Sequence, residues 1–83
     1  MVLLSRTEFQ ILTELARTPG RILSREQLLA TVWGPEYRDD TRVLRCAIYR
    51  LRQKLERDAD QPHYLRGRRD VGYWIAVSEE ADA

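Results

Sequence analysis

Arginine and lysine side chains are concentrated in one stretch of the chain, residues 41–57, which reads TRVLRCAIYRLRQKLER. This stretch holds six Lys or Arg residues and one acidic residue, Glu56, so its local charge is +5 in a chain whose net charge is +1. Guanidinium and ammonium groups bind phosphates, and arginine also bonds guanine in the major groove. Recognition of a nucleic acid is therefore the first candidate chemistry, and an ordinary basic surface helix is the alternative.

The same stretch has the periodicity of one amphipathic helix. At about 100° per residue, Leu44, Ile48, Leu51 and Leu55 fall within a narrow arc. The opposite side holds Arg42, Cys46, Tyr49, Arg50 and Gln53. An apolar stripe opposite cationic and polar side chains lets a helix pack on a core and enter the major groove at the same time.

Two shorter helices are predicted before this one, each beginning with a capping box. Ser5 and Glu8 start the first, and Ser24 and Gln27 start the second. The expected buried residues of the two helices are Phe9, Leu12, Leu15, Ala16, Leu28, Leu29 and Val32. Pro19-Gly20 and Trp33-Gly34-Pro35 end these helices, and Asp39 or Asp40 is expected to cap the third.

The pattern changes after residues 58–62, DADQP, which break the third helix. Residues 64–66 and 73–77 are predicted strands, joined by a hairpin turn with the sequence GRRDVG. Three helices followed by a hairpin predict an α+β fold, a winged helix-turn-helix, over residues 1–77. Residues 78–83 are expected to be a disordered acidic tail.

The composition excludes several classes of protein. A chain of 83 residues with 43% hydrophobic residues is long enough for one small globular domain. It lacks an apolar run of the ~20 residues that span a membrane, and its N-terminus is not that of a signal peptide. Cys46 and His63 are the only residues of their types, so we expect no disulfide, no metal, no cofactor and no catalysis, in a reducing cytoplasm.

Three pieces of the chain resemble the effector domain of OmpR/PhoB-type response regulators, the bacterial transcription factors of two-component phosphorelay systems. They are LSRTEFQILTELARTPGRILSREQLLATVWG, RLRQKLE and VGYWI, and the resemblance covers residues 3–77. It implies sequence-specific binding of double-stranded DNA, with recognition helix 41–57 in the major groove and wing 66–72 at the minor groove. It also implies RNA polymerase as a second partner, and a monomer that can form head-to-tail dimers on direct-repeat DNA.

Wheel position and the family's contact positions together assign roles to individual residues. Base readout is expected from Arg42, Cys46, Tyr49 and Arg50, and phosphate contacts from Thr7, Arg25, Arg45 and Arg52. The wing cations are Arg66, Arg68 and Arg69, and the polymerase-contact loop would present Glu36, Tyr37 and Arg38. Ala47 also matches a contact position and could touch a thymine methyl group. For Cys46, an ordinary small apolar residue is the competing interpretation.

The chain departs from the family pattern in the wing and at the start. Gly67 stands where the family usually has a threonine, and Asp70 stands where it usually has a glycine. Asp70 places a negative charge at the turn, which disfavours deep entry into the minor groove. In the family a four-stranded sheet and a receiver domain usually precede the first helix, and this sequence is expected to hold at most the last of those strands. The departures in the wing and the acidic C-terminal end motivate an alternative function, a winged-helix protein-interaction module that has lost DNA binding.

Overall fold

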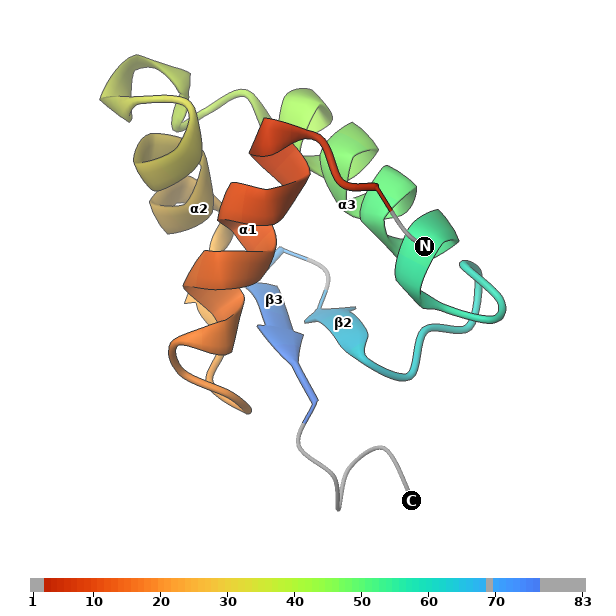
Figure 1. Ribbon diagram of the computed structural model, residues 1–83. Helices are drawn as coiled ribbons and strands as arrows, with labels where there is room; N and C mark the ends of the chain where they lie inside the picture. The colour runs from red at the N-terminus through yellow and green to blue at the C-terminus, as the bar shows by residue number, and fades with distance from the viewer. Residues whose placement is uncertain (1–2, 69, 77–83) are drawn as a thin grey trace.

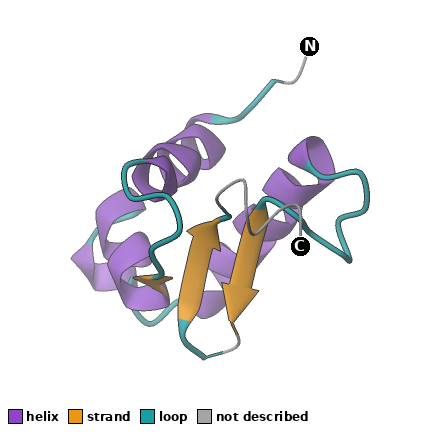
Figure 2. Ribbon diagram, turned by 90° about the horizontal axis from the view of Figure 1, so that it is seen from below, coloured by secondary structure: helices purple, strands orange, loops and turns teal. Residues whose placement is uncertain are grey.

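The computed structural model describes residues 3–68 and 70–76 of the chain (Figure 1). Its elements are α1 (Arg6–Ala16), β1 (Leu23–Ser24), α2 (Arg25–Val32), the 3-10 helix η1 (Pro35–Tyr37), α3 (Thr41–Leu55), β2 (Leu65–Arg68) and β3 (Gly72–Ile75). The predicted winged helix-turn-helix is confirmed: three helices form one layer, and the β2–β3 hairpin lies against them (Figure 2). The acidic tail predicted at 78–83 lies outside the described residues.

The three strands form one antiparallel sheet in the order β1-β3-β2. The hairpin pairs Leu65 with Ile75 and Gly67 with Tyr73, so β2 extends two residues beyond the predicted strand 64–66. Gly72 pairs with Ser24 of β1, and a Cβ added at Gly72 would lie 1.9 Å from the carbonyl oxygen of Leu23. Only a glycine lets the hairpin approach the α1–α2 connection this closely.

The capping box at the start of α1 is confirmed, but of the residues predicted to be buried in this helix only Leu15 is fully buried, while Leu12 is partly buried and Phe9 and Ala16 are exposed. The Ser5 N–H donates to Oε1 of Glu8 at 2.8 Å, and the Glu8 N–H donates to Oγ of Ser5 at 3.1 Å. Ile11 and Leu15 are fully buried, whereas Phe9 is 61% exposed. Phe9 is about 200° around the helix from Ile11 and so faces away from the core. Glu8, the residue before Phe9, faces the core instead and is buried.

The cap of α2 is confirmed in part. The Gln27 N–H donates to Oγ of Ser24 at 3.0 Å, while within the described residues no bond returns from the Gln27 side chain to the Ser24 backbone. Leu28 and Leu29 are buried as expected, and Val32 is partly buried against the same core. α2 therefore contributes its apolar side to the space between α1 and α3.

α3 has the expected apolar stripe and ends two residues before the predicted Arg57. Leu44, Ile48 and Leu51 are buried in the common core, and Leu55 packs partly against it. Asp40 takes the N-cap position, but its side chain makes no capping hydrogen bond, so the predicted aspartate cap is not formed.

Glu56 explains where α3 ends. Its backbone leaves the helical conformation, with φ −96° and ψ 150°, and its carboxylate is buried. The two carboxylate oxygens accept the N–H groups of His63, Tyr64 and Leu65 at 2.8, 2.9 and 2.7 Å. Because an ionised carboxylate is a strong acceptor, Glu56 fastens the entry of β2 to the end of α3.

Candidate nucleic-acid interface

The outward side of α3 is polar and accessible over its first three turns. Its exposed side chains are Arg42, Arg45, Cys46, Tyr49 and Arg50. They project opposite Leu44, Ile48 and Leu51, so the packing of the stripe fixes which side chains face outward. Ala47 differs from expectation: it is 5% exposed and belongs to the core cluster, so its methyl group is not presented to a groove.

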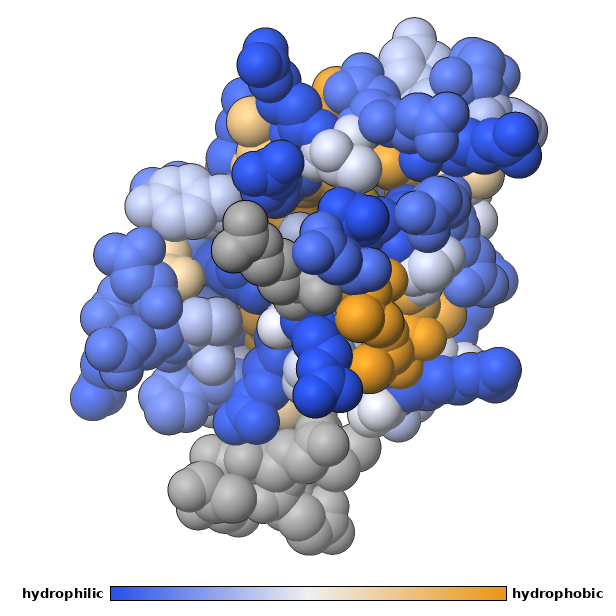
Figure 3. Space-filling model, turned by 180° about the vertical axis from the view of Figure 1, so that it is seen from behind, coloured by the Kyte–Doolittle hydropathy of each residue, from blue (hydrophilic) through white to orange (hydrophobic). Residues whose placement is uncertain are grey.

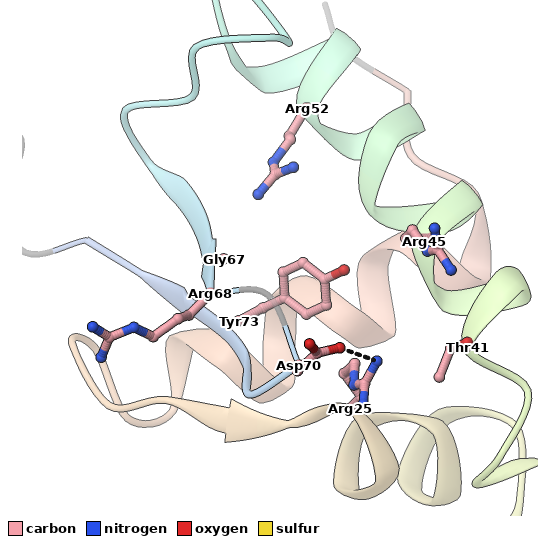
Figure 4. Close-up of a pocket in the computed structure, with 8 residues that line it drawn as sticks. All are labelled: Arg25, Thr41, Arg45, Arg52, Gly67, Arg68, Asp70 and Tyr73. Atoms are coloured by element: carbon pink, nitrogen blue, oxygen red, sulfur yellow. Dashed lines mark ion pairs between the residues drawn. The ribbon is translucent and has the colours of Figure 1, made fainter.

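A cleft of about 440 Å³ separates α3 from the β2–β3 hairpin. We call it the arginine cleft; it is lined by Arg25, Thr41, Arg45, Arg52, Gly67, Arg68, Asp70 and Tyr73 (Figure 4). Four arginines and one carboxylate give the cleft a strongly positive character. The structure thus brings together Arg25, Arg45 and Arg52, which were predicted as phosphate contacts from separate parts of the sequence.

Arg52 lies at the upper end of the arginine cleft and connects α3 to the hairpin. Its Nε donates to the carbonyl oxygen of Leu65 at 2.9 Å, and its guanidinium carbon lies 5.8 Å from the centre of the Tyr73 ring. Burial lowers the pKa of the Arg52 guanidinium below its ordinary value, while the neighbouring Tyr73 and Glu56 act in the opposite direction. Arginine nevertheless stays protonated at neutral pH, so Arg52 contributes a partly desolvated positive charge.

The absence of a side chain at Gly67 leaves room for the side chains of Tyr73 and Arg52. A Cβ at Gly67 would lie 2.7 Å from Cδ1 of Tyr73 and 3.2 Å from Nη2 of Arg52. The Tyr73 ring points from the hairpin into the arginine cleft, with its hydroxyl directed toward α3 (Figure 4). A threonine at position 67, as in the usual family pattern, would collide with this ring. Tyr73 is thus only partly buried and forms the floor of the cleft.

Arg25 and Asp70 face each other at the lower end of the arginine cleft. Nη1 of Arg25 lies 3.7 Å from Oδ1 of Asp70, an ion pair too long for a hydrogen bond (Figure 4). Nε of Arg25 is buried and has no hydrogen-bond partner among the described residues. Arg25 therefore carries donor capacity that the folded chain leaves unused.

The remaining predicted site residues lie outside the centre of the arginine cleft. The Arg68 side chain extends away from α3 (Figure 4), and Nε of Arg66 donates to the carbonyl oxygen of His63 at 3.3 Å. Arg69 lies outside the described residues. Thr7 is partly buried in the first turn of α1 and does not line the cleft. Glu36, Tyr37 and Arg38 are exposed at η1, which leaves their predicted role open.

The surface around these residues suits a charged ligand. Hydrophilic side chains cover most of the face opposite the view of Figure 1, around a small apolar patch (Figure 3). Within residues 3–68 and 70–76 no group of three His, Cys, Asp or Glu side chains could hold a metal ion. In the same part of the chain, no helix is long and apolar enough to cross a membrane.

Comparison with known proteins decides the family. Residues 1–75 match the family described as "Transcriptional regulatory protein, C terminal". The chain belongs to this family.

Two solved structures of response regulators are similar to this C-terminal regulatory domain. DrrB of Thermotoga maritima, an OmpR/PhoB homologue, is 34% identical over 92% of this chain and 34% of DrrB, with a TM-score of 0.79. The RstA DNA-binding domain of Klebsiella pneumoniae, in complex with the RstA box, is 39% identical over 90% of this chain and 74% of that one, also with a TM-score of 0.79. The resemblance to the OmpR/PhoB type is confirmed, and the chain spans about a third of the length of DrrB.

Sequence reasoning missed three residues that position α3 in this regulatory domain. Glu56 is one, and the others are Glu8 and Lys54, whose Oε1 and Nζ atoms lie 2.5 Å apart. The Lys54 ammonium, followed by the Ser5 N–H, lowers the pKa of Glu8 below its ordinary value. The capping box identified Glu8 as a helix-start residue, but nothing local in the sequence pairs it with a lysine 46 positions away.

Proposed function

We propose that this domain binds double-stranded DNA sequence-specifically, as the effector domain of a two-component response regulator. In this proposal α3 enters the major groove and the β2–β3 hairpin lies at the minor groove. The observation that carries it is the two-sided arrangement of α3, with Leu44, Ile48 and Leu51 in the core and basic side chains exposed opposite them. A helix held by its apolar side can present the other side to base edges.

A solved relative supports DNA binding by this domain. RstA is described in complex with the RstA box, and its DNA-binding domain has the same fold at 39% identity. The exposed basic side of α3 and the positive arginine cleft also disfavour the alternative, an interaction module without DNA binding. DNA as partner agrees with the cytoplasmic location expected from the single cysteine.

The arginines on the outward side of α3 and those that line the arginine cleft are proposed to have different roles. Arg50, Arg42 and Tyr49 are exposed on α3 and suit contacts with base edges, where arginine bonds guanine bidentately. Cys46 lies among them. Arg45, Arg52 and Arg25 line the arginine cleft and suit phosphates of the backbone. Thr7, Arg66, Arg68 and Arg69 remain proposed contacts with flanking phosphates or the minor groove.

Titration of selected and random duplexes with the domain tests the proposal. Affinity should fall steeply as salt rises, because neutralised phosphates release counterions. Arg50→Ala should lose about 1–3 kcal/mol on the preferred site and little on random DNA. Arg17→Ala, which removes an exposed arginine at the end of α1, is the matched control and should change neither. Absence of binding to any duplex at about 50 mM salt would exclude the proposed function.

Two finer roles belong to the same proposal. Residues Glu36, Tyr37 and Arg38 at η1 are proposed to contact RNA polymerase, and the domain is proposed to bind direct repeats head to tail while being monomeric without DNA. Tyr37→Ala should lower transcription activation while leaving DNA affinity unchanged. A duplex carrying two repeats should bind two copies, whereas a single repeat should bind one.

A further inference from the structure

The Arg25–Asp70 ion pair has three properties that set it apart from an ordinary surface pair. Arg25 is largely buried, with 29% of its side chain exposed, whereas Asp70 is 77% exposed. The shortest separation of the charged atoms is 3.7 Å, so the carboxylate sits near the guanidinium without a hydrogen bond. Nε of Arg25 remains without a partner in the described part of the chain. The pair neutralises Arg25 while leaving its hydrogen-bonding capacity unfilled.

The backbone at the hairpin turn holds the carboxylate in this place. Asp70 has φ 65°, the left-handed conformation that aspartate and asparagine tolerate better than most other side chains. The Val71 N–H donates to the carbonyl oxygen of Arg68 at 3.0 Å and closes the turn around Asp70. Gly72 then anchors the hairpin against Leu23. The position of Asp70 over the arginine cleft is therefore set by the turn rather than by the strength of the ion pair.

A DNA phosphate is a better partner for Arg25 than Asp70 is. Phosphate oxygens accept short, strong hydrogen bonds from arginine, and Nη1 of Arg25, which Asp70 leaves without a hydrogen bond, is a donor for one. An ion pair with one highly exposed member contributes little stability, so its separation is easy. Arg45 and Arg52 line the same cleft and add attraction for an incoming phosphate.

We infer that Asp70 is an internal competitor of DNA: its carboxylate occupies, at Arg25, the place that a backbone phosphate takes in the complex. This inference rests on the proposed DNA binding and adds a regulatory contact to it. Asp70 lowers affinity for all sequences alike, because the contact concerns the backbone and not the bases. It thereby leaves the contribution of α3 to sequence choice unchanged while reducing nonspecific binding.

The test compares the native domain with Asp70→Asn, which keeps the side-chain shape and tolerates the left-handed conformation while removing the charge. On selected and random duplexes alike, affinity should rise by the same factor, about three- to tenfold at 50 mM salt, and the salt slope should steepen by up to about 0.9. Asp60→Asn, which removes an equal charge from an exposed turn outside the cleft, is the matched control and should have less than half of either effect. Asp70→Gly, which restores the residue usual in the family, should behave as Asp70→Asn does.

Arg25→Ala completes a double-mutant cycle. It should weaken binding slightly in the native domain and abolish the gain in the Asp70→Asn domain. A gain that persists in the double variant, or an Asp70→Asn domain that binds no more tightly than the native one, would overturn the inference. In either case binding by the native domain still stands, whereas a native domain that binds no duplex rejects the proposed function itself.

Discussion

The first three turns of α3 and its last turn are both basic, but their charges are used differently. Arg42, Tyr49 and Arg50 are exposed and make no hydrogen bond or ion pair within the described part of the chain. Arg52 and Lys54 in the last turn, with Glu56 after it, are each bound to another element: β2, α1 and the loop before β2. The first group is available to a ligand, whereas the second sets the position of the helix, and within it only Arg52 also lines the arginine cleft. Local charge alone therefore does not identify a binding residue.

Removal of Glu56 should give the largest effect, because it would separate the last turn of α3 from the hairpin. Glu56→Ala leaves the N–H groups of His63, Tyr64 and Leu65 without their acceptor and should lower the free energy of unfolding by about 3 kcal/mol. Urea denaturation measures this change. Glu56→Gln keeps one acceptor oxygen and should lose about half as much. A loss below about 1 kcal/mol for Glu56→Ala would show that the three bonds do not fasten the hairpin.

Arg50 in the exposed part of α3 and Arg52 in its last turn allow the two parts of the helix to be compared with the same residue type. Arg52→Ala removes the bond to the Leu65 carbonyl and should lower stability by about 1–2 kcal/mol. It should also weaken binding to all duplexes alike and reduce the salt slope by about 1. Arg50→Ala should leave stability within about 0.5 kcal/mol while affecting the preferred site. Equal stability losses in the two variants would remove the distinction between them.

The smallest effect concerns pH and the Glu8–Lys54 pair. Because the pKa of Glu8 is lowered in the folded state, the unfolded chain binds more protons in acid. The pair's contribution is therefore complete above the ordinary glutamate pKa of 4.5 and is lost as the pH falls through the lower folded value. Denaturation midpoints between pH 7 and pH 3 should show this loss, and Glu8→Gln should flatten it. Lys54→Met removes the largest cause of the lowered pKa of Glu8, so the folded pKa should rise toward its ordinary value and the loss of stability in acid should become smaller.

The sequence predicted the parts of the fold that depend on neighbouring residues. Ser5 and Glu8 form their box, and Leu44, Ile48 and Leu51 are buried together, because capping and helix periodicity are local properties. The buried side of α1 was predicted correctly at Leu15 but not at Phe9, because Glu8 occupies a core-facing position that a hydrophobic pattern gives to an apolar residue. Its pairing with Lys54 is tertiary and leaves no local signal.

The arginine cleft could be predicted only in part for the same reason. Arg25, Arg45 and Arg52 were expected to bind phosphate, but their gathering around Tyr73 depends on the hairpin register that places Tyr73 opposite Gly67. The register is set by the turn and by the pairing of β3 with β1. The pairing with β1 is a tertiary contact, so the sequence of the hairpin alone does not predict it. The contact of Asp70 with Arg25 likewise appears only once the turn is folded over α2.

The close approach at Gly72 also means that two positions of the hairpin should differ in how well they tolerate substitution. Any side chain at position 72 would meet the Leu23 carbonyl, so a library of variants at this site should yield folded domains only with glycine. Position 70 lies at the exposed turn two residues earlier, where the charge can be exchanged without moving the strands. Single substitutions at the turn should thus adjust the strength of DNA binding without moving β3, the strand that follows the turn.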